Sequence, residues 1–385
     1  METILLKDHA ALSANVRNST WVEVNLEAIR QNIVHSLRAV ETPALVVVKA
    51  NGYGHGAAAI GRTAISAGAK MLGVATIGEA LDLRESGIAA PVLIMGPVVG
   101  DELRLLPEVD CSMTLWNREQ LSDAAAIGKA ARKPIPVHIK VDTGMARFGV
   151  QPEQAIEFVA AASQTPGIFV EGISTHLASS DVEDATSTLE QIAKFRTIVA
   201  ALENRRLRPP IVHCANSAAA FRFPEARFDM VRLGISTYGV NPNPDWKLPF
   251  DLVPAMAWKA RILNVQWHEA GEAIGYGGEY RCARREHIAT IGAGYADGFR
   301  RVPKYVNEVL IRGARAPVVG RLCMQHCMAV LPASLAGEVH ADEEAVLLGR
   351  QRGEEITPSE LAAKWGTNEW DVFCGINALI RRTYE

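Results

Sequence analysis

The stretch Leu45-Val46-Val47-Val48, followed at once by Lys49-Ala50-Asn51-Gly52-Tyr53-Gly54-His55-Gly56, contains the pattern that decides the fold. Four consecutive apolar residues without alternation predict a strand that is buried on both faces, as a parallel sheet requires. The glycines end this strand, and an amphipathic segment follows over residues 57–67. The chain is therefore expected to begin its core with one strand–loop–helix unit.

The same unit recurs along the chain as far as residue 233. Seven further apolar runs occupy residues 72–75, 92–95, 111–115, 137–141, 169–173, 211–214 and 230–233. Amphipathic segments separate them, among them residues 118–130, 152–162 and 185–202. Eight such units within about 200 residues predict an α/β protein with a (β/α)8 barrel. A doubly wound open sheet is the alternative that the pattern alone leaves open.

The pattern changes after the proline-containing connector Asn241-Pro242-Asn243-Pro244. Alternating or β-branched runs separated by glycines then predict strands at residues 257–265, 287–291, 308–311, 316–319 and 345–348. We therefore predict two domains, a (β/α)8 barrel over residues 1–250 and a β-strand-rich domain over residues 251–385.

Composition excludes several classes of protein. The net charge is −3 over 385 residues, and no long basic run is present, which argues against a nucleic-acid or membrane-surface partner. No signal-peptide core and no run of about 18 apolar residues occur, so a cytoplasmic protein is expected. The six cysteines include Cys214, Cys323 and Cys327, but they lack the spacing of a zinc site or of a disulfide framework. We expect no metal site.

Polar residues follow several of the predicted strands, and in a (β/α)8 barrel all strand ends meet at one mouth. The polar residues are Lys49, the segment Asp142–Arg147, Thr175-His176, Asn216-Ser217 and the segment Arg232–Ile235. Together they would form an anion-binding site that contains a potential Schiff-base lysine.

Each of these residues also has a purely structural interpretation. Lys49 could extend to solvent, and Tyr53 with His55 could close a loop. His176 could be a core histidine, Asn216 a helix cap, and the two arginines members of ion pairs. The occurrence of all of them at strand ends favours the active-site interpretation.

The segment Val47–Gly56 resembles the cofactor-lysine segment of the alanine racemase family. The resemblance extends from Trp21 to about Cys374, and six further segments carry it. They are Lys140–Arg147, His213–Ser217, Val231–Ile235, Gly275–Gly277, Gly294–Gly298 and Gly320–Met324.

The resemblance implies a barrel joined to a β domain, in a head-to-tail homodimer whose two active sites are shared between subunits. Lys49 would bind pyridoxal 5'-phosphate covalently, and Tyr276 of the other subunit would face the opposite side of the cofactor. Arg232 would pair with the pyridine nitrogen, and Arg147 with the phenolic oxygen and the substrate carboxylate. The remaining implied cofactor contacts are Tyr53, His176, Asn216, Ser217, Gly234 and Ile235.

Four further residues acquire implied roles from the resemblance. Met324 and Gln325 would lie at the carboxylate site, and Tyr295 at the route by which substrate enters. Lys140 matches a lysine that is carbamylated in some members of the family.

The chemistry of racemisation agrees with this set of residues. A proton must leave one face of Cα and return to the other, so two bases on opposite faces are the simplest design. Lys49 and Tyr276 would be these bases, and Tyr276 needs a neighbour that lowers its pKa from about 10, for which His176 is the best candidate. Arg232 stays protonated and would disfavour a proton on the pyridine nitrogen. The implied reaction interconverts L- and D-alanine and supplies D-alanine for peptidoglycan.

The sequence departs from the family pattern at three places. Gln325 replaces a usual aspartate, Ala378 stands where some members have a tyrosine that lines the pocket, and Ile380-Arg381-Arg382 replaces Val-Pro-Arg. The loss of bulk at Ala378 leaves open a racemase whose main or broad activity is on serine or another small amino acid. A pyridoxal-phosphate decarboxylase and a non-enzymatic cofactor-binding barrel are less favoured alternatives.

Overall fold

A computed structural model describes residues 18–302 and 306–385. The N-terminal segment over which the sequence predicts no signal peptide lies mostly outside these residues. Within them the chain forms two compact units: residues 25–255 with Tyr384–Glu385, and residues 18–24 with 256–383. The predicted division at residue 250 assigned the start of the chain to the barrel. Instead, β1 (Thr20–Val24) belongs to the second unit, because it pairs antiparallel with β10 (Met256–His268).

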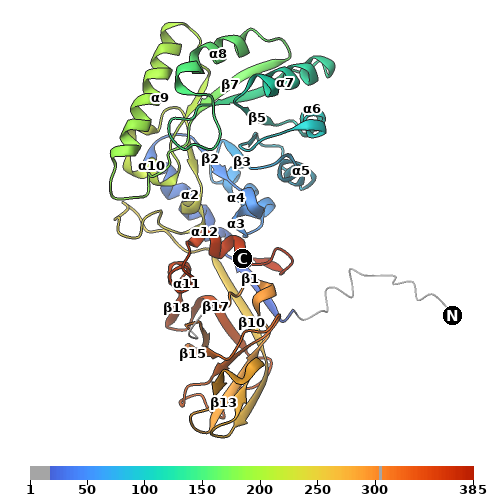
Figure 1. The fold of residues 1–385 in the computed structure, drawn as a ribbon, viewed down its shortest axis with the longest axis vertical. Helices are drawn as coiled ribbons and strands as arrows, with labels where there is room; N and C mark the ends of the chain where they lie inside the picture. The colour runs from blue at the N-terminus through green and yellow to red at the C-terminus, as the bar shows by residue number, and fades with distance from the viewer. Residues whose placement is uncertain (1–17, 303–305) are drawn as a thin grey trace, which may run out of the picture. The chain divides into compact units, whose positions relative to one another are not determined.

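The first unit contains a parallel sheet that closes almost completely into a barrel (Figure 1). Among the described residues its strand order is β8-β7-β6-β5-β4-β3-β2-β9, and a parallel bridge between His213 and Met230 links the two end strands. The strands are β2 (Ala44–Val47), β3 (Met71–Val74), β4 (Val92–Ile94), β5 (Ser112–Leu115), β6 (Ile135–Lys140), β7 (Ile168–Ser174), β8 (Ile211–His213) and β9 (Val231–Leu233). The predicted fold class is confirmed, and the open-sheet alternative is wrong.

Helical segments connect the barrel strands, and the longer ones cover the outer side of the sheet (Figure 1). They are α2 (Leu26–Val40), α3 (Lys49–Tyr53), α4 (Ala57–Ser66), α5 (Ile77–Glu85), α6 (Leu106–Val109), α7 (Arg118–Ala130), α8 (Ala155–Ser163), α9 (Thr186–Asn204) and α10 (Ser217–Arg222). Several begin at an Asn or Thr whose side chain accepts a hydrogen bond from the first turn, as at Asn25, Thr76, Asn117 and Asn216. None of the described helices has the length and apolar character that a membrane span requires.

The second unit is mostly antiparallel β-structure, as predicted. Besides β1 and β10, its strands are β11 (Ala273–Ile274), β12 (Tyr280–Arg281), β13 (Glu286–Ile291), β14 (Glu308–Ile311), β15 (Ala314–Val319), β16 (Cys327–Val330), β17 (Glu344–Gln351), β18 (Glu354–Ile356) and β19 (Arg382–Tyr384). Two helices, α11 (Pro358–Trp365) and α12 (Glu369–Gly375), were not predicted. Both are short, and each begins at a capping residue, Thr357 or Asn368.

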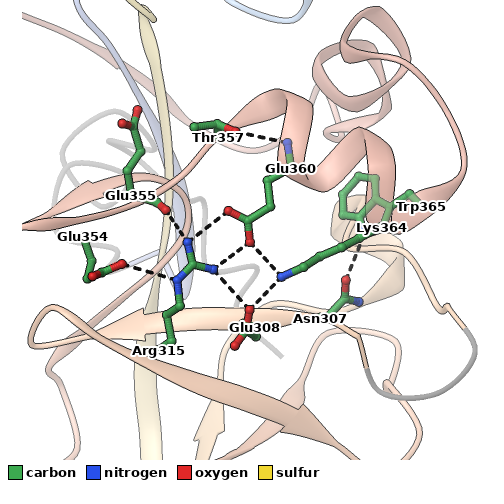
Figure 2. Close-up of polar contacts among 9 residues, drawn as sticks. All are labelled: Asn307, Glu308, Arg315, Glu354, Glu355, Thr357, Glu360, Lys364 and Trp365. Atoms are coloured by element: carbon green, nitrogen blue, oxygen red, sulfur yellow. Dashed lines mark hydrogen bonds and ion pairs between the residues drawn. The ribbon is translucent and has the colours of Figure 1, made fainter.

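A network of charged side chains holds α11 against the sheet of the second unit (Figure 2). Arg315 on β15 donates to Glu360 on α11 (2.7 Å) and to Glu308 on β14 (3.1 Å). Lys364 donates to the same two carboxylates, at 2.8 Å each. Each carboxylate is thus shared by two cations, an arrangement in which the members restrain each other more than an isolated surface pair does.

Glu360→Gln is expected to lower the Tm at pH 7 by about 2–4 °C, the shift that about 1 kcal/mol produces in a unit of this size. The hydrogen bond from Arg315, with help from Lys364, lowers the pKa of Glu360 to about 2 from 4.5. A lowered carboxyl pKa stabilises the fold above the unfolded value, and this contribution is lost as pH falls from about 5 toward 2. Calorimetry should therefore show that the Tm values of the wild type and of Glu360→Gln converge as the pH falls. The exposed Glu269, paired with Arg285, supplies the control Glu269→Gln, and an equal Tm loss there would contradict the assignment.

Candidate active site

Lys49 follows β2 after one residue, Val48, and stands at the start of a left-handed turn. Ala50, Asn51, Gly52 and Tyr53 all have positive φ, between 51° and 62°. This conformation costs roughly 1–2 kcal/mol for each residue that carries a side chain, so surrounding contacts must impose it. Hydrogen bonds from Gly52 N–H to Val48 O (2.7 Å) and from Gly54 N–H to Ala50 O (2.9 Å) help to hold the turn. The half-buried Lys49 therefore extends from a rigid backbone.

The same turn places Tyr53 beside residues from the ends of β8 and β9. Tyr53 is buried and stacks on Tyr238, with 4.7 Å between ring centroids. Gly234 N–H donates to Ser217 Oγ (2.8 Å). A Cβ atom at Gly234 would lie 3.0 Å from Tyr53 Oη and 3.9 Å from Ser217 Oγ. The glycine thus leaves open a small space between two hydroxyl groups.

Two helical segments begin at this space. Asn216 caps α10, accepting from Ala219 N–H (3.0 Å), and also accepts from Ser180 Oγ (2.9 Å). The 3-10 helix η4 (Ile235–Tyr238) begins directly after Gly234. The first-turn N–H groups of a helix have no partner within the helix and attract anions, phosphate in particular. Tyr53, Ser217, Gly234 and Ile235 therefore fit a phosphate-bearing group.

Arg232 on β9 is a buried cation whose hydrogen-bond acceptors among the described residues are all neutral. Its Nη1 donates to His213 Nδ1 (3.1 Å), and its Nη2 to Thr175 O (2.9 Å), Cys214 O (2.8 Å) and His176 Nδ1 (3.1 Å). Burial lowers its pKa to about 10, which keeps it charged at neutral pH. A buried charge without a counter-ion is costly, so this arginine marks a place where an acceptor is to bind.

His176 is neutral in this environment. Burial, and then the positive charges of Arg232, Lys140, Arg147 and Lys49, hold its pKa well below the usual range. Because Arg232 donates to Nδ1, the proton of the neutral ring belongs on Nε2. His176 therefore presents an N–H donor.

A buried chain of histidines, which the sequence reasoning missed, supports Arg232 from behind. Because His213 accepts from Arg232 through Nδ1, its own proton lies on Nε2, which donates to His138 Nδ1 (2.8 Å). His138 Nε2 in turn donates to Glu171 Oε2 (3.0 Å). Ser112 Oγ completes the chain by donating to the same carboxylate oxygen (2.5 Å). The sequence did contain a signal for this chain, since His138 and His213 are polar residues inside the otherwise apolar strands β6 and β8. The chain orients the arginine, and burial holds the pKa of His213 well below its usual range.

Lys140 and Arg147 flank the loop after β6. Burial, and then the charges of Arg232 and Arg147, lower the pKa of Lys140 to about 7. Asp142 Oδ1 shapes the loop by accepting from the N–H groups of Gly144, Met145 and Ala146. Arg147 is exposed and lies over the Phe148 ring, 5.9 Å from its centroid, at a cavity of about 700 Å³. The charges of Lys49, Lys140, Arg147 and Arg232 all act on His176, although Lys49, Lys140 and Arg232 do not line the cavity at Arg147.

The remaining candidates belong to the second unit. Tyr276 follows Gly275 and is 69% exposed, at the rim of a cavity of about 360 Å³. Tyr295 N–H donates to Cys323 O (3.1 Å) and Ala296 N–H to Met324 O (2.9 Å), which holds Tyr295 beside the exposed Met324 and Gln325. Gly294 permits this approach, because a Cβ there would lie 2.3 Å from Cys323 O. Tyr276 is thus accessible to another molecule, and its catalytic role stays a prediction.

The cysteines singled out in the sequence lie in both units, Cys214 in the barrel and Cys323 and Cys327 in the second unit. Among the described residues no cluster of His, Cys, Asp or Glu has the arrangement of a metal site, and the cysteines are free thiols. Burial raises the pKa of Cys214 to about 12, which keeps that thiol protonated and unreactive at neutral pH.

Comparison with known proteins extends these observations to the whole chain. Residues 24–242 match the family model described as alanine racemase, N-terminal domain, and residues 255–384 match alanine racemase, C-terminal domain. A protein named alanine racemase from Symbiobacterium thermophilum is 42% identical, over 95% of this chain and 97% of that protein.

Solved structures agree with the sequence matches. The alanine racemase of Bacillus anthracis, solved with bound L-Ala-P, has a TM-score of 0.89 at 33% identity, with 96% of both chains covered. A histidine racemase from Leuconostoc mesenteroides has a TM-score of 0.88 at 25% identity, covering 96% of this chain and 98% of that one. The chain therefore belongs to the alanine racemase family and is an amino-acid racemase.

Proposed function

We propose that this racemase interconverts L- and D-alanine with pyridoxal 5'-phosphate bound to Lys49, and that it supplies D-alanine for peptidoglycan. The observation that carries the proposal is Arg232, a buried cation with neutral acceptors only, two residues before the glycine that leaves open a small space between the Tyr53 and Ser217 hydroxyl groups. A homodimer in the cytoplasm, with Tyr276 supplied by the partner, completes the proposal.

Pyridoxal phosphate, when bound, supplies an electron sink that makes the Cα proton of an amino acid removable. Tyr53, Ser217 and the N–H groups at Gly234 and Ile235 would bind its phosphate, with Asn216 fixing the start of α10. Arg232 would donate to the pyridine nitrogen. Because Arg232 keeps its own proton, it would leave that nitrogen unprotonated, which would weaken the electron sink and suppress transamination.

Two bases on opposite faces would move the proton. Lys49, once released, would serve one face, and Tyr276 the other. The Nε2–H of neutral His176 is suited to donate to the Tyr276 oxygen, which would stabilise the phenolate. Arg147 would bind the substrate carboxylate, with Met324 and Gln325 beside it and Tyr295 on the path of substrate entry.

Chiral chromatography after incubation of the holoenzyme with single L-amino acids tests the proposal. We expect D-alanine to form fastest, together with absorbance from a lysine-bound cofactor. Ala378 in place of a bulkier residue supports the alternative of broad or main activity on serine, since one side chain changes discrimination by about 1–3 kcal/mol. Serine turnover that exceeds alanine turnover would establish the alternative.

Lys140 is expected to form a carbamate at neutral pH. With a pKa of about 7, close to half of its amine is uncharged at pH 7 and can add to CO₂, releasing one proton. The carbamate would replace a buried positive charge beside Arg147 with a negative one. ¹³C NMR in labelled bicarbonate should show one signal that grows as pH rises through 7 and is absent in Lys140→Ala. The exposed Lys129 provides the control Lys129→Ala, and a signal that survives loss of Lys140 would contradict the prediction.

A further inference from the structure

The first turn of helix α5 contains Glu79, whose side chain does not make the hydrogen bond that its position predicts. Thr76-Ile77-Gly78-Glu79 has the spacing of a capping box, in which the glutamate accepts from the N–H of the capping residue. Thr76 does cap the helix, accepting from Glu79 N–H (3.2 Å). The Glu79 carboxylate, however, accepts from Ala75 N–H through Oε2 (2.7 Å) and from Ala50 N–H through Oε1 (2.6 Å).

These two N–H groups belong to neighbouring loops at the barrel mouth. Ala75 follows β3 directly, and Ala50 is the residue next to Lys49. Strands β2 and β3 pair in parallel, and their register continues past the end of β2 in the bond from Val48 N–H to Gly73 O (2.8 Å). The carboxylate therefore ties the ends of β2 and β3 together next to Lys49.

Ala50 is also the first residue of the left-handed turn, with φ 52° and ψ 50°. The Ala50 N–H group donates to the carboxylate of Glu79, and a charged acceptor makes a stronger hydrogen bond than a neutral one. Asn51 Oδ1 secures the far side of the turn by accepting from Ala57 N–H (3.0 Å). Of these two anchors, only Glu79 acts on the peptide that joins Lys49 to Ala50.

We propose that Glu79 is a positioning residue for Lys49: its carboxylate fixes the Lys49–Ala50 peptide and thereby the backbone from which the lysine side chain reaches the cofactor. This inference rests on the proposed role of Lys49. A displacement of about 1 Å in a reacting group can cost roughly 100-fold in rate, so backbone freedom here is expected to affect the chemical step more than substrate binding.

The test compares Glu79→Ala and Glu79→Gln with Glu85→Ala, a change at an exposed position of the same helix. For each holoenzyme we would measure hydrogen exchange over residues 49–54, the absorbance of the lysine–cofactor adduct, and kcat and KM for alanine. Glu79→Ala should raise exchange at least about tenfold, because one anchored N–H is released. It should also lower kcat about 100-fold with little change in KM, and reduce the adduct absorbance at limiting cofactor.

Glu79→Gln separates positioning from general stability, since it keeps the shape of the side chain and one of its two acceptor oxygens. We expect intermediate exchange and intermediate kcat, with Glu85→Ala matching the wild type. Unchanged kcat and adduct absorbance in both Glu79 variants would overturn the inference, whether or not exchange rises. Absence of an adduct at Lys49 in the wild-type protein would instead refute the proposed function on which the inference depends.

Discussion

Lys49→Ala is expected to abolish racemisation in both directions and to eliminate covalent attachment of pyridoxal phosphate. Loss of one positioned base costs roughly 10²–10⁴-fold in rate by itself. The same change also removes the proposed anchor of the cofactor, while Tyr53, Ser217 and the small open space at Gly234 remain. The variant should therefore still bind the cofactor, but reversibly.

Borohydride reduction followed by peptide mass spectrometry measures the attachment directly. The wild-type protein should carry the reduced cofactor on the peptide that contains Lys49, and the variant should carry none. Lys70→Ala, at an exposed lysine next to β3, is the matched control and should behave as the wild type. A reduced adduct that persists in Lys49→Ala would identify a different lysine and refute the assignment.

Tyr276→Phe is expected to remove proton exchange from one enantiomer while largely preserving it for the other. Each base serves one face of Cα, so deletion of the phenol oxygen should cost roughly 10²–10⁴-fold on that face alone. The resemblance to alanine racemases assigns L-alanine to Tyr276. Tyr276 is 69% exposed on its own unit, as a residue that acts in a partner's site must be.

Deuterium incorporation from solvent, followed separately for L- and D-alanine, distinguishes the two faces. Tyr280→Phe is a suitable control, because the Tyr280 hydroxyl donates to Glu286 (2.7 Å) in the second unit. It should leave the ratio of the two exchange rates unchanged. Equal losses from both enantiomers in Tyr276→Phe would contradict the two-base assignment.

A mixed dimer of Lys49→Ala and Tyr276→Phe subunits tests whether the site is shared. If Tyr276 acts in the partner's site, one of the two composite sites retains both bases, and verified heterodimers should recover up to half of the wild-type activity per dimer. Heterodimers that stay inactive would show that each site is built within one chain.

The local sequence predicted a parallel sheet covered on both faces and favoured the (β/α)8 barrel over an open sheet. Apolar runs such as Leu45–Val48 and Val92–Met95 are continuous, and only a sheet covered on both faces buries such strands. Lys49, His176 and Arg232 were identifiable because barrel topology brings all strand ends to one mouth. The place of β1 was not predictable in this way, since its partner β10 lies more than 200 residues away and pairing depends on the closed fold.

Tertiary structure alone decided how the candidate residues work. His138 and His213 lie 75 residues apart, and only neighbouring inward positions in the barrel join them to Glu171 and Arg232. The neutral state of His176 and the pKa of Lys140 near 7 arise from burial among cations, a property of the packed interior. The sequence determined which side chains stand at the barrel mouth because strand periodicity is local. Their protonation and orientation depend on distances and burial, which exist only once the chain has folded.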